Sequence, residues 1–330
     1  MNFYRDENVS VITDTHFGRT FKEGVSLDRR GEYEAKILDD FGEFLLHPQT
    51  NIVVHAGDLF DTPEVNYEVL LKVYSKIRNA ALENKDETIY YFIAGNHDLN
   101  RDDSKNEHCS FRLLQILLKT EKNVHFVFNN PFLFSMLEKK PNGNLINLIL
   151  FPWDYKNSEL TASYMSEANY TIEHFEESVP EANYVIGHFN DPVPEAIANF
   201  KGIKLSGHFH KRHLTADGTF FVGSFYPIAF GEESDDSEMI TLTLNQYENM
   251  NNEELKNKRV RILLKEGETL PVEHDCLQLI GKKVNEEKDI NLEVTQCEDC
   301  DFKQMFFECL KDCKLRDELW TAYLKGKNNA

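Results

Sequence analysis

The chain has 330 residues, more than the roughly 100 to 200 of a usual domain, so we expect one large domain with a smaller appendage. Hydrophobic residues make up 41% and charged residues 28% of it, values that are typical of a folded protein and exclude a disordered one. The net charge of −20 excludes strong nonspecific DNA binding by the chain alone, because Lys and Arg supply that affinity. A nucleic-acid substrate would need a local basic surface, bound metals or a partner protein.

No run of the sequence reaches the roughly 18 apolar residues of a membrane span, and MNFYRDENVS lacks the apolar core of a secretory signal. We therefore expect a cytoplasmic protein without membrane contact, whose six cysteines stay reduced. Two cysteine pairs near the C-terminus leave two alternatives open, a structural zinc site or ordinary thiols. The short spacing favours thiols for all four: Cys297, Cys300, Cys309 and Cys313.

Short apolar runs that end in polar residues alternate with helical patterns through the first half of the chain, as in α/β proteins. The runs are NVSVITD, NIVVHAGD and TIYYFIAGNHD. Apolar residues at helical spacing predict a helix over residues 33–45, and Pro63 is expected to open a second one. These helices should cover a sheet.

From Val124 onward the sequence is rich in strand patterns. VHFVF, FLFSML and INLILFPW come first, and the turn residues 141–144 predict a hairpin between the last two. A helix over residues 158–177, the strand NYVIGH and a short helix should follow, and then the strands GIKLSGH, TFFVGS and EMITLTL. This order predicts an α/β fold with a two-sheet β-sandwich flanked by helices.

The polar stretch 245–257 is the best candidate for a linker. We therefore expect a catalytic domain over residues 1–245 and a small α+β cap domain over residues 246–330. RVRILL, residues 277–282 and INLEV predict strands in the cap. An apolar helical stripe follows, which either packs against its own domain or docks a partner: Leu315, Leu319, Trp320, Tyr323 and Leu324.

The densest basic cluster of the acidic chain lies at the start of the predicted cap. It consists of Lys256, Lys258, Arg259, Arg261 and Lys265. These side chains either contact a DNA backbone or lie on a solvated strand face, and the sequence favours neither alternative.

Side chains of the metal-binding types follow the ends of the core strands. They are Asp14, His16, Asp58, Asn96, His188, His208 and His210. Because strand ends meet at one rim of an open α/β sheet, these side chains should converge in one crevice. A single Gly-Asp or Gly-His is usually a turn or a structural histidine, but five such fragments in order, each after an apolar strand, indicate a site.

Two metal ions fit this set of side chains, with Asp58 as the bridging carboxylate. One ion is assigned three residues: Asp14, His16 and His210. The other is assigned Asn96, His188 and His208. Nitrogen and oxygen ligands without a thiolate favour manganese or iron over a structural zinc. His97 is the candidate catalytic residue, because an imidazole can bind a phosphate or protonate the leaving oxygen.

These residues resemble the calcineurin-like metallophosphoesterase family, whose pattern is D-x-H, G-D, G-N-H-[DE], G-H and G-H-x-H. All five elements are present, and the resemblance covers about residues 9–240. Five segments are similar to the SbcD-type nuclease branch, which includes phage recombination endonuclease subunits: DTHFGRT, AGDLFDTPEV, AGNHDLN, GHFHKR and GSFYPIAFGE. The FPWDY segment resembles the phage members too. Asp61 stands where some members of the family carry a second histidine, so that histidine is not carried over.

The resemblance implies a manganese-dependent DNA exonuclease and endonuclease that processes DNA ends in recombination and repair. It also implies a homodimer that works with an SbcC-type coiled-coil ATPase, in the host cytoplasm if the chain is viral. The alternative is a phosphatase or small-molecule phosphodiesterase of the same fold. A non-catalytic clamp would lack some of the ligands, and the sequence lacks none of them.

Overall fold

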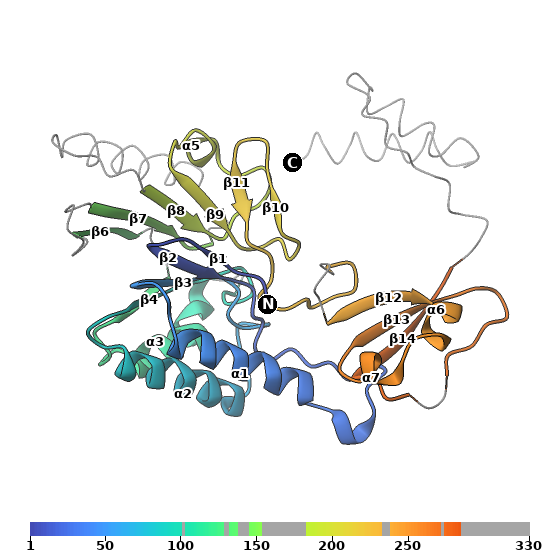
Figure 1. Ribbon diagram of the computed structural model, residues 1–330. Helices are drawn as coiled ribbons and strands as arrows, with labels where there is room; N and C mark the ends of the chain where they lie inside the picture. Colours follow the sequence, from blue (N-terminus) through green and yellow to red (C-terminus); the bar gives the residue numbers. More distant parts are fainter. Residues whose placement is uncertain are drawn as a thin grey trace. The chain divides into compact units, whose positions relative to one another are not determined.

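The computed structural model describes residues 1–100, 103–128, 132–137, 145–153, 183–232, 238–271 and 274–284 (Figure 1). Residues 1–283 form one compact unit and residues 284–330 form a second. In the described part of the first unit, three β-sheets have five, six and three strands. The first two sheets carry the predicted site.

The first sheet has the order β1-β2-β3-β4-β5, with only β1 antiparallel to its neighbour. Its strands are β1 (Tyr4–Arg5), β2 (Val9–Ile12), β3 (Ile52–Ala56), β4 (Ile89–Ile93) and β5 (Val124–Val127). Side chains of β2 and β3 are buried throughout, as in parallel strands that are covered on both faces. The sheet therefore needs a layer on each side.

Helices supply one of these layers. They are α1 (Glu32–Leu46), α2 (Tyr67–Glu83) and α3 (Ser110–Leu117), and Figure 1 shows them on one side of the first sheet. Two short 3-10 helices, Leu27–Arg29 and Asp103–His108, precede α1 and α3. None of the helices in the described ranges has the length and apolarity of a membrane span.

The sequence predicted α1 correctly, but it predicted the wrong start for α2. The prediction of α1 is confirmed, with Ile37, Phe41 and Leu45 on its buried face. The predicted start of α2 at Pro63 is wrong, because α2 begins at Tyr67. The side chain of Asn66 accepts a hydrogen bond from Val69 N at 2.9 Å, and this cap fixes the first turn of the helix.

The second sheet has the order β10-β11-β9-β8-β7-β6. Its strands are β6 (Phe132–Leu137), β7 (Leu145–Phe151), β8 (Asn183–Gly187), β9 (Ile203–Ser206), β10 (His213–Leu214) and β11 (Thr219–Phe221). The antiparallel pairing of β6 with β7 confirms the two predicted strands of the hairpin. The turn between them and the helix predicted over residues 158–177 lie outside the described residues.

The two sheets pack face to face, which confirms the predicted sandwich. Alternate side chains of each strand point to opposite faces, so Val53 packs under the helices and Val54 packs between the sheets. Tyr91 and Ile93 of the first sheet share the inner core with side chains of the second: Leu148, Leu150, Tyr184, Ile186, Leu205 and Val222. The short helix α5 (Glu195–Ala198) packs on the outer face of the second sheet.

The third sheet is parallel and has the order β12-β13-β14. Its elements are β12 (Met239–Thr243), α6 (Leu244–Glu248), α7 (Asn252–Leu255), β13 (Arg259–Leu264) and β14 (Gln278–Lys283). The stretch predicted as a linker forms α6 and α7, so that prediction is wrong. EMITLTL forms β12, which pairs with β13 and lies outside the sandwich.

The division of the chain after residue 245 stays a prediction. It falls between β12 and the strand with which β12 pairs. The predicted strand INLEV, the four C-terminal cysteines and the apolar stripe over residues 315–324 lie outside the described residues. What the sequence predicts for these three segments therefore stays a prediction.

Candidate metal centre

The predicted ligands follow the carboxyl ends of strands in both sheets of the sandwich. Those after β2, β3 and β4 are Asp14, His16, Asp58 and Asn96, and those after β8 and β9 are His188, His208 and His210. Hydrogen bonds join the two sets: His208 N donates to the Asp14 carboxylate at 3.1 and 3.2 Å. His188 Nδ1 donates to the Ala56 carbonyl at 2.9 Å. The site therefore spans the seam between the sheets.

One group consists of Asp14, His16 and His210, whose ligand atoms lie within 4.8 Å of one another. The two Nε2 atoms of His16 and His210 face each other at 3.1 Å. Asp14 Oδ1 lies 3.9 Å from His16 Nε2 and 3.8 Å from His210 Nε2. Two imidazole nitrogens and a carboxylate converge here, a donor set that fits a divalent cation.

The second group consists of Asp58, His188 and His208. Asn96 Oδ1 lies 2.9 Å from both His188 Nε2 and His208 Nδ1. Asp58 Oδ2 lies 3.3 Å from His188 Nε2 and 3.7 Å from His16 Nε2, between the two groups. All seven residues therefore meet at one place, and their binding of metal ions stays a prediction.

Burial and neighbouring charges shift the pKa values of the ionisable groups of the site. Burial raises the pKa of Asp14, although the charge of His188 opposes the rise. Burial also disfavours the Asp58 carboxylate, but His188 and His16 outweigh that effect and hold its pKa well below the usual range. Burial likewise disfavours the charged His188, yet Asp58 raises the pKa of His188 to about 9. The negative charge of Asp58 that favours a proton on His188 would equally attract a metal cation.

Left-handed backbone marks the same residues. Among the residues that the structure describes, four that are not glycine have a positive φ: Asp14 (52°), His16 (46°), Asp58 (53°) and His208 (81°). This conformation costs about 1–2 kcal/mol per residue, and such strain clusters at functional sites. All four are predicted ligands. The strain therefore supports the site independently of the sequence motifs.

A glycine lets the loop after β3 approach the second sheet. Gly57 has a φ of +99°, and a Cβ on it would lie 2.3 Å from His188 Nδ1. Any other side chain would displace His188 from its hydrogen bond to the Ala56 carbonyl. The position requires glycine because of this close approach.

Thr15 and His55 form a layer beneath the predicted ligands. The Thr15 hydroxyl donates its hydrogen to the Leu59 carbonyl at 3.1 Å. It therefore accepts a hydrogen bond from His55 Nε2 at 3.0 Å, so the proton of the His55 ring is on Nε2. Burial lowers the pKa of His55 to about 3, so its ring is neutral. The pair fixes the turn between Asp14 and His16.

Asp98, the last residue of the G-N-H-[DE] element, is a second support that was not among the predicted site residues. Its buried carboxylate accepts three backbone hydrogen bonds, from Phe60 N at 2.8 Å, Gly95 N at 2.9 Å and Leu59 N at 3.2 Å. Burial, reinforced by the charge of Asp58, raises the pKa of Asp98 to about 7. The side chain ties the loop after β3 to the loop after β4.

His97 lies beside the first group, as the catalytic prediction requires. Its backbone N donates to Asp58 Oδ1 at 2.8 Å, and its Nδ1 donates to the Asp61 carbonyl at 2.7 Å. The His97 ring stands edge-on to the His16 ring, with 4.7 Å between centroids. Since Nδ1 is the donor to Asp61, Nε2 is the nitrogen available to a substrate.

Sequence reasoning missed two further residues of the site, Trp153 and Glu232. The Trp153 ring lies 4.8 Å from the His208 ring and 5.7 Å from the His188 ring, measured between centroids. Glu232 Oε1 lies 2.9 Å from His210 Nδ1. Both residues belong to segments that resemble the nuclease branch, FPWDY and GSFYPIAFGE, so the signal was present without a role attached to it.

The basic cluster at the start of the predicted cap is not a continuous surface. Arg259 is only 3% exposed, so the expectation that it contacts DNA or solvent is wrong. Its guanidinium donates to the Pro227 carbonyl at 2.9 Å and lies over the rings of Phe21 and Tyr33. These groups come from distant parts of the chain and bury the arginine.

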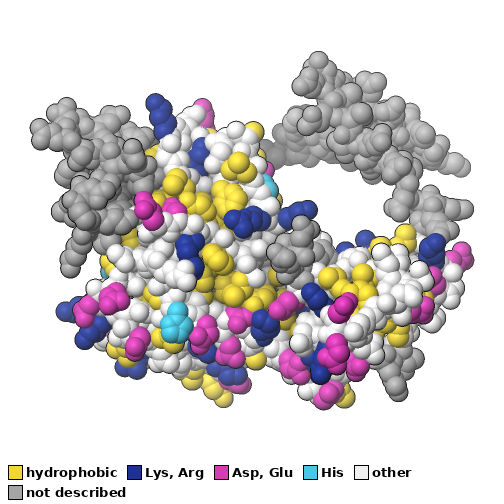
Figure 2. All heavy atoms as spheres, viewed as in Figure 1, with side chains coloured by type: hydrophobic (Ala, Val, Ile, Leu, Met, Phe, Trp, Pro, Cys, Tyr) yellow, Lys and Arg dark blue, Asp and Glu magenta, His cyan; other side chains and the backbone are white. Residues whose placement is uncertain are grey.

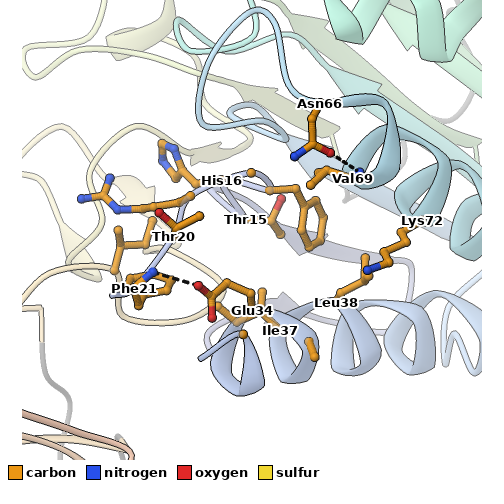
Figure 3. Close-up of a pocket in the computed structure, with 16 residues that line it drawn as sticks. Thr15, His16, Thr20, Phe21, Glu34, Ile37, Leu38, Asn66, Val69 and Lys72 are labelled. Atoms are coloured by element: carbon orange, nitrogen blue, oxygen red, sulfur yellow. Dashed lines mark hydrogen bonds between the residues drawn. The ribbon is translucent and has the colours of Figure 1, made fainter. Parts of the chain in front are cut away.

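An apolar pocket of about 280 Å³ adjoins His16 (Figure 3). Its apolar wall includes Phe17, Phe21, Ile37, Leu38 and Val69. Glu34 accepts a hydrogen bond from Phe21 N at 2.8 Å on one side, and Asn66 caps α2 on the other. These polar groups at the rim are therefore engaged within the chain.

Two solved structures are among the known proteins that are similar to this chain. A dimetal phosphatase from Danio rerio has a TM-score of 0.38 and 11% identity, over 65% of this chain and 86% of its own. The nuclease MPE from Pseudomonas putida has a TM-score of 0.33 and 14% identity, over 70% of this chain and 82% of its own. No curated protein matches the sequence. The model of the calcineurin-like phosphoesterases matches residues 8–212, which include all seven predicted ligands, and the chain belongs to this family.

Proposed function

We propose that this protein is a manganese-dependent DNA exonuclease and endonuclease subunit that processes DNA ends in recombination and repair. The observation that carries the proposal is the convergence of nitrogen and oxygen donors in two groups, with the Asp58 carboxylate between His188 of one group and His16 of the other. Two divalent cations held there would supply Lewis acidity toward a phosphodiester and lower the pKa of the attacking water. The donor set, without thiolates, suits manganese.

We assign the donation of a proton to His97. The Asp61 carbonyl holds the Nδ1–H of His97, which leaves Nε2 to act on a substrate. From its place beside His16 and Asp58, a protonated His97 can give its Nε2 proton to the 3′ oxygen as the P–O bond breaks. The leaving strand then departs as an alcohol, and the imidazole becomes neutral.

The choice of DNA as substrate rests on the resemblance to nucleases, and contacts of the site support it. Asp61, in the segment AGDLFDTPEV, has Oδ1 3.4 Å from His16 Nδ1 and 3.3 Å from Arg19 Nη1. Glu232, in the segment GSFYPIAFGE, bonds to His210. Two nuclease-like segments therefore contact predicted ligands from outside, where a generic phosphoesterase needs only the donors themselves.

The charge of the chain supports a partner. Its net charge is −20, and Figure 2 shows basic and acidic side chains interspersed on the visible face. Such a surface holds a DNA backbone weakly. We therefore propose that the protein acts as a homodimer with an SbcC-type coiled-coil ATPase, which would hold the DNA.

The direct test is hydrolysis by the purified full-length protein in the presence of Mn²⁺. We expect cleavage of bis(p-nitrophenyl) phosphate, and cleavage of linear duplex DNA that increases when the ATPase is added. Hydrolysis of p-nitrophenyl phosphate with no cleavage of DNA in the presence of the ATPase would instead identify a phosphatase.

A pair of variants tests the role of His97. The substitution His97→Ala should lower kcat for DNA by about 10²- to 10⁴-fold, the usual contribution of a positioned acid. His47→Ala is the matched control, because the His47 side chain is 72% exposed at the end of α1. Equal turnover by both variants would refute the assignment.

A further inference from the structure

The carboxylate of Glu232 bridges His210 and the backbone of its own turn. Oε1 lies 2.9 Å from His210 Nδ1, and Oε2 accepts a hydrogen bond from Ile228 N at 2.8 Å. The Glu232 side chain is 15% exposed and that of His210 is 25% exposed, so water competes little for the contact between them. Both oxygens of the carboxylate are therefore committed.

The contact to Glu232 decides which nitrogen of His210 carries the proton. A carboxylate only accepts hydrogen bonds, so Nδ1 must be the donor. In the neutral ring the other nitrogen, Nε2, then carries the lone pair, which faces His16 Nε2 at 3.1 Å, and it lies 3.8 Å from Asp14 Oδ1. A carboxylate placed behind a histidine in this way is the usual means of orienting a metal ligand.

We propose that Glu232 is a positioning residue that sets the tautomer and the ring orientation of His210 for cation binding with Asp14 and His16. The inference rests on the proposed metal centre. It does not depend on DNA being the substrate.

Arg259 extends this arrangement into the third sheet. Its guanidinium donates to the carbonyls of Pro227 at 2.9 Å and Ile228 at 3.3 Å, and to Gln278 Oε1 at 2.7 Å. Ile228 is also the residue whose N–H holds Glu232. Arg259 therefore holds the turn at residues 227 and 228, and this turn holds the Glu232 carboxylate through Ile228 N.

A simpler role for Glu232 would be to close the turn over residues 228–232. The substitution Glu232→Gln separates the two roles, because a glutamine has one accepting oxygen and one donating nitrogen. If the amide oxygen accepts from Ile228 N, the amide nitrogen faces His210 Nδ1 and favours the tautomer with the proton on Nε2. The turn keeps its bond, whereas His210 no longer presents a lone pair toward Asp14 and His16.

The test is a titration of metal-depleted full-length protein with Mn²⁺, followed by calorimetry. The wild type should bind two ions, and Glu232→Gln should lose about 10- to 100-fold in affinity at one of them. Glu68→Gln is the matched control, because Glu68 is an exposed carboxylate of α2 that pairs with Lys72, and it should bind as the wild type does. Arg259→Lys, which loses the two-pronged contact, should show a smaller loss than Glu232→Gln.

Nitrogen NMR of His210 in the metal-free protein gives an independent readout, at a pH high enough to keep the ring neutral. The wild type should show the proton on Nδ1 and Glu232→Gln should show it on Nε2. Equal Mn²⁺ affinities or equal tautomers in the two proteins would overturn the inference. A wild type that binds no Mn²⁺ but shows the tautomer switch would overturn the proposed metal centre and leave the role of Glu232 standing.

Discussion

His55 offers a quantitative test of the scaffold under the metal centre. Its ring lies in β3 near the rings of Phe41 and Phe92, and its Nε2 bonds to Thr15. Burial lowers the pKa of His55 to about 3, whereas the pKa of histidine in an unfolded chain is about 6.5. The folded protein therefore excludes a proton that the unfolded chain accepts.

The sign and size of the effect follow from these two pKa values. Because the pKa of His55 is lower in the folded state, its contribution is fully present above about pH 6.5 and is lost as the pH falls toward about 3. At about pH 5 the unfolded chain gains roughly 2 kcal/mol from protonating this side chain. At about pH 7.5 the gain is close to zero.

The substitution His55→Phe keeps an aromatic ring between Phe41 and Phe92 and removes the titrating group. Urea unfolding of metal-free protein at about pH 5 and about pH 7.5 gives the pH dependence of the free energy of unfolding. We expect the wild type to lose about 2 kcal/mol more than His55→Phe over this interval. The exposed His47→Gln should behave as the wild type. An equal loss in wild type and His55→Phe would refute the reasoning.

Three further outcomes follow from the site. Gly57→Ala places a Cβ 2.3 Å from His188 Nδ1, and calorimetric melting should show a loss of roughly 2–4 kcal/mol; an unchanged melting curve would contradict the required glycine. Asp98→Leu orphans three buried N–H groups and should lower the free energy of unfolding in urea by roughly 3–5 kcal/mol, with a smaller loss for Asp98→Asn, which keeps an acceptor. Mn²⁺ at about 100 times its Kd should raise the free energy of unfolding of the wild type by about 2.7 kcal/mol, and EDTA should reverse the rise. Asp58→Asn should gain less from Mn²⁺, and equal gains in the two proteins would argue against Asp58 as a shared ligand.

The convergence of the site could be predicted because each donor directly follows an apolar strand. In NIVVHAGD, five buried residues end at Gly57-Asp58, so the position of the carboxylate is fixed by local sequence. Parallel pairing then places Asp58 beside the residues that follow β2 and β4. The sandwich could be predicted for the same reason, since continuous apolar runs separated by helices imply covered parallel strands.

The contacts of Glu232 and Arg259 could not be predicted, because they join residues that no periodic sequence pattern connects. Glu232 reaches His210 through a turn that leaves no pattern in the sequence. Arg259 reads as part of a basic surface because its neighbours are charged, yet its burial depends on carbonyls at residues 227 and 228 and on rings at residues 21 and 33. Such contacts are set by tertiary packing alone.

Because the predicted ligands come from both sheets, the ribosome synthesises them at widely separated times. Asp14 and Asp58 leave the ribosome early, whereas His210 follows Asp14 by about 200 residues, which takes about 10–40 s at ordinary rates of synthesis. During that interval the carboxylates of the first sheet lack the imidazoles that β8 and β9 bring to them. A nascent chain that stalls before β9 holds five of the seven predicted ligands and lacks His208 and His210, so we expect neither metal group to be complete until β9 has joined the second sheet.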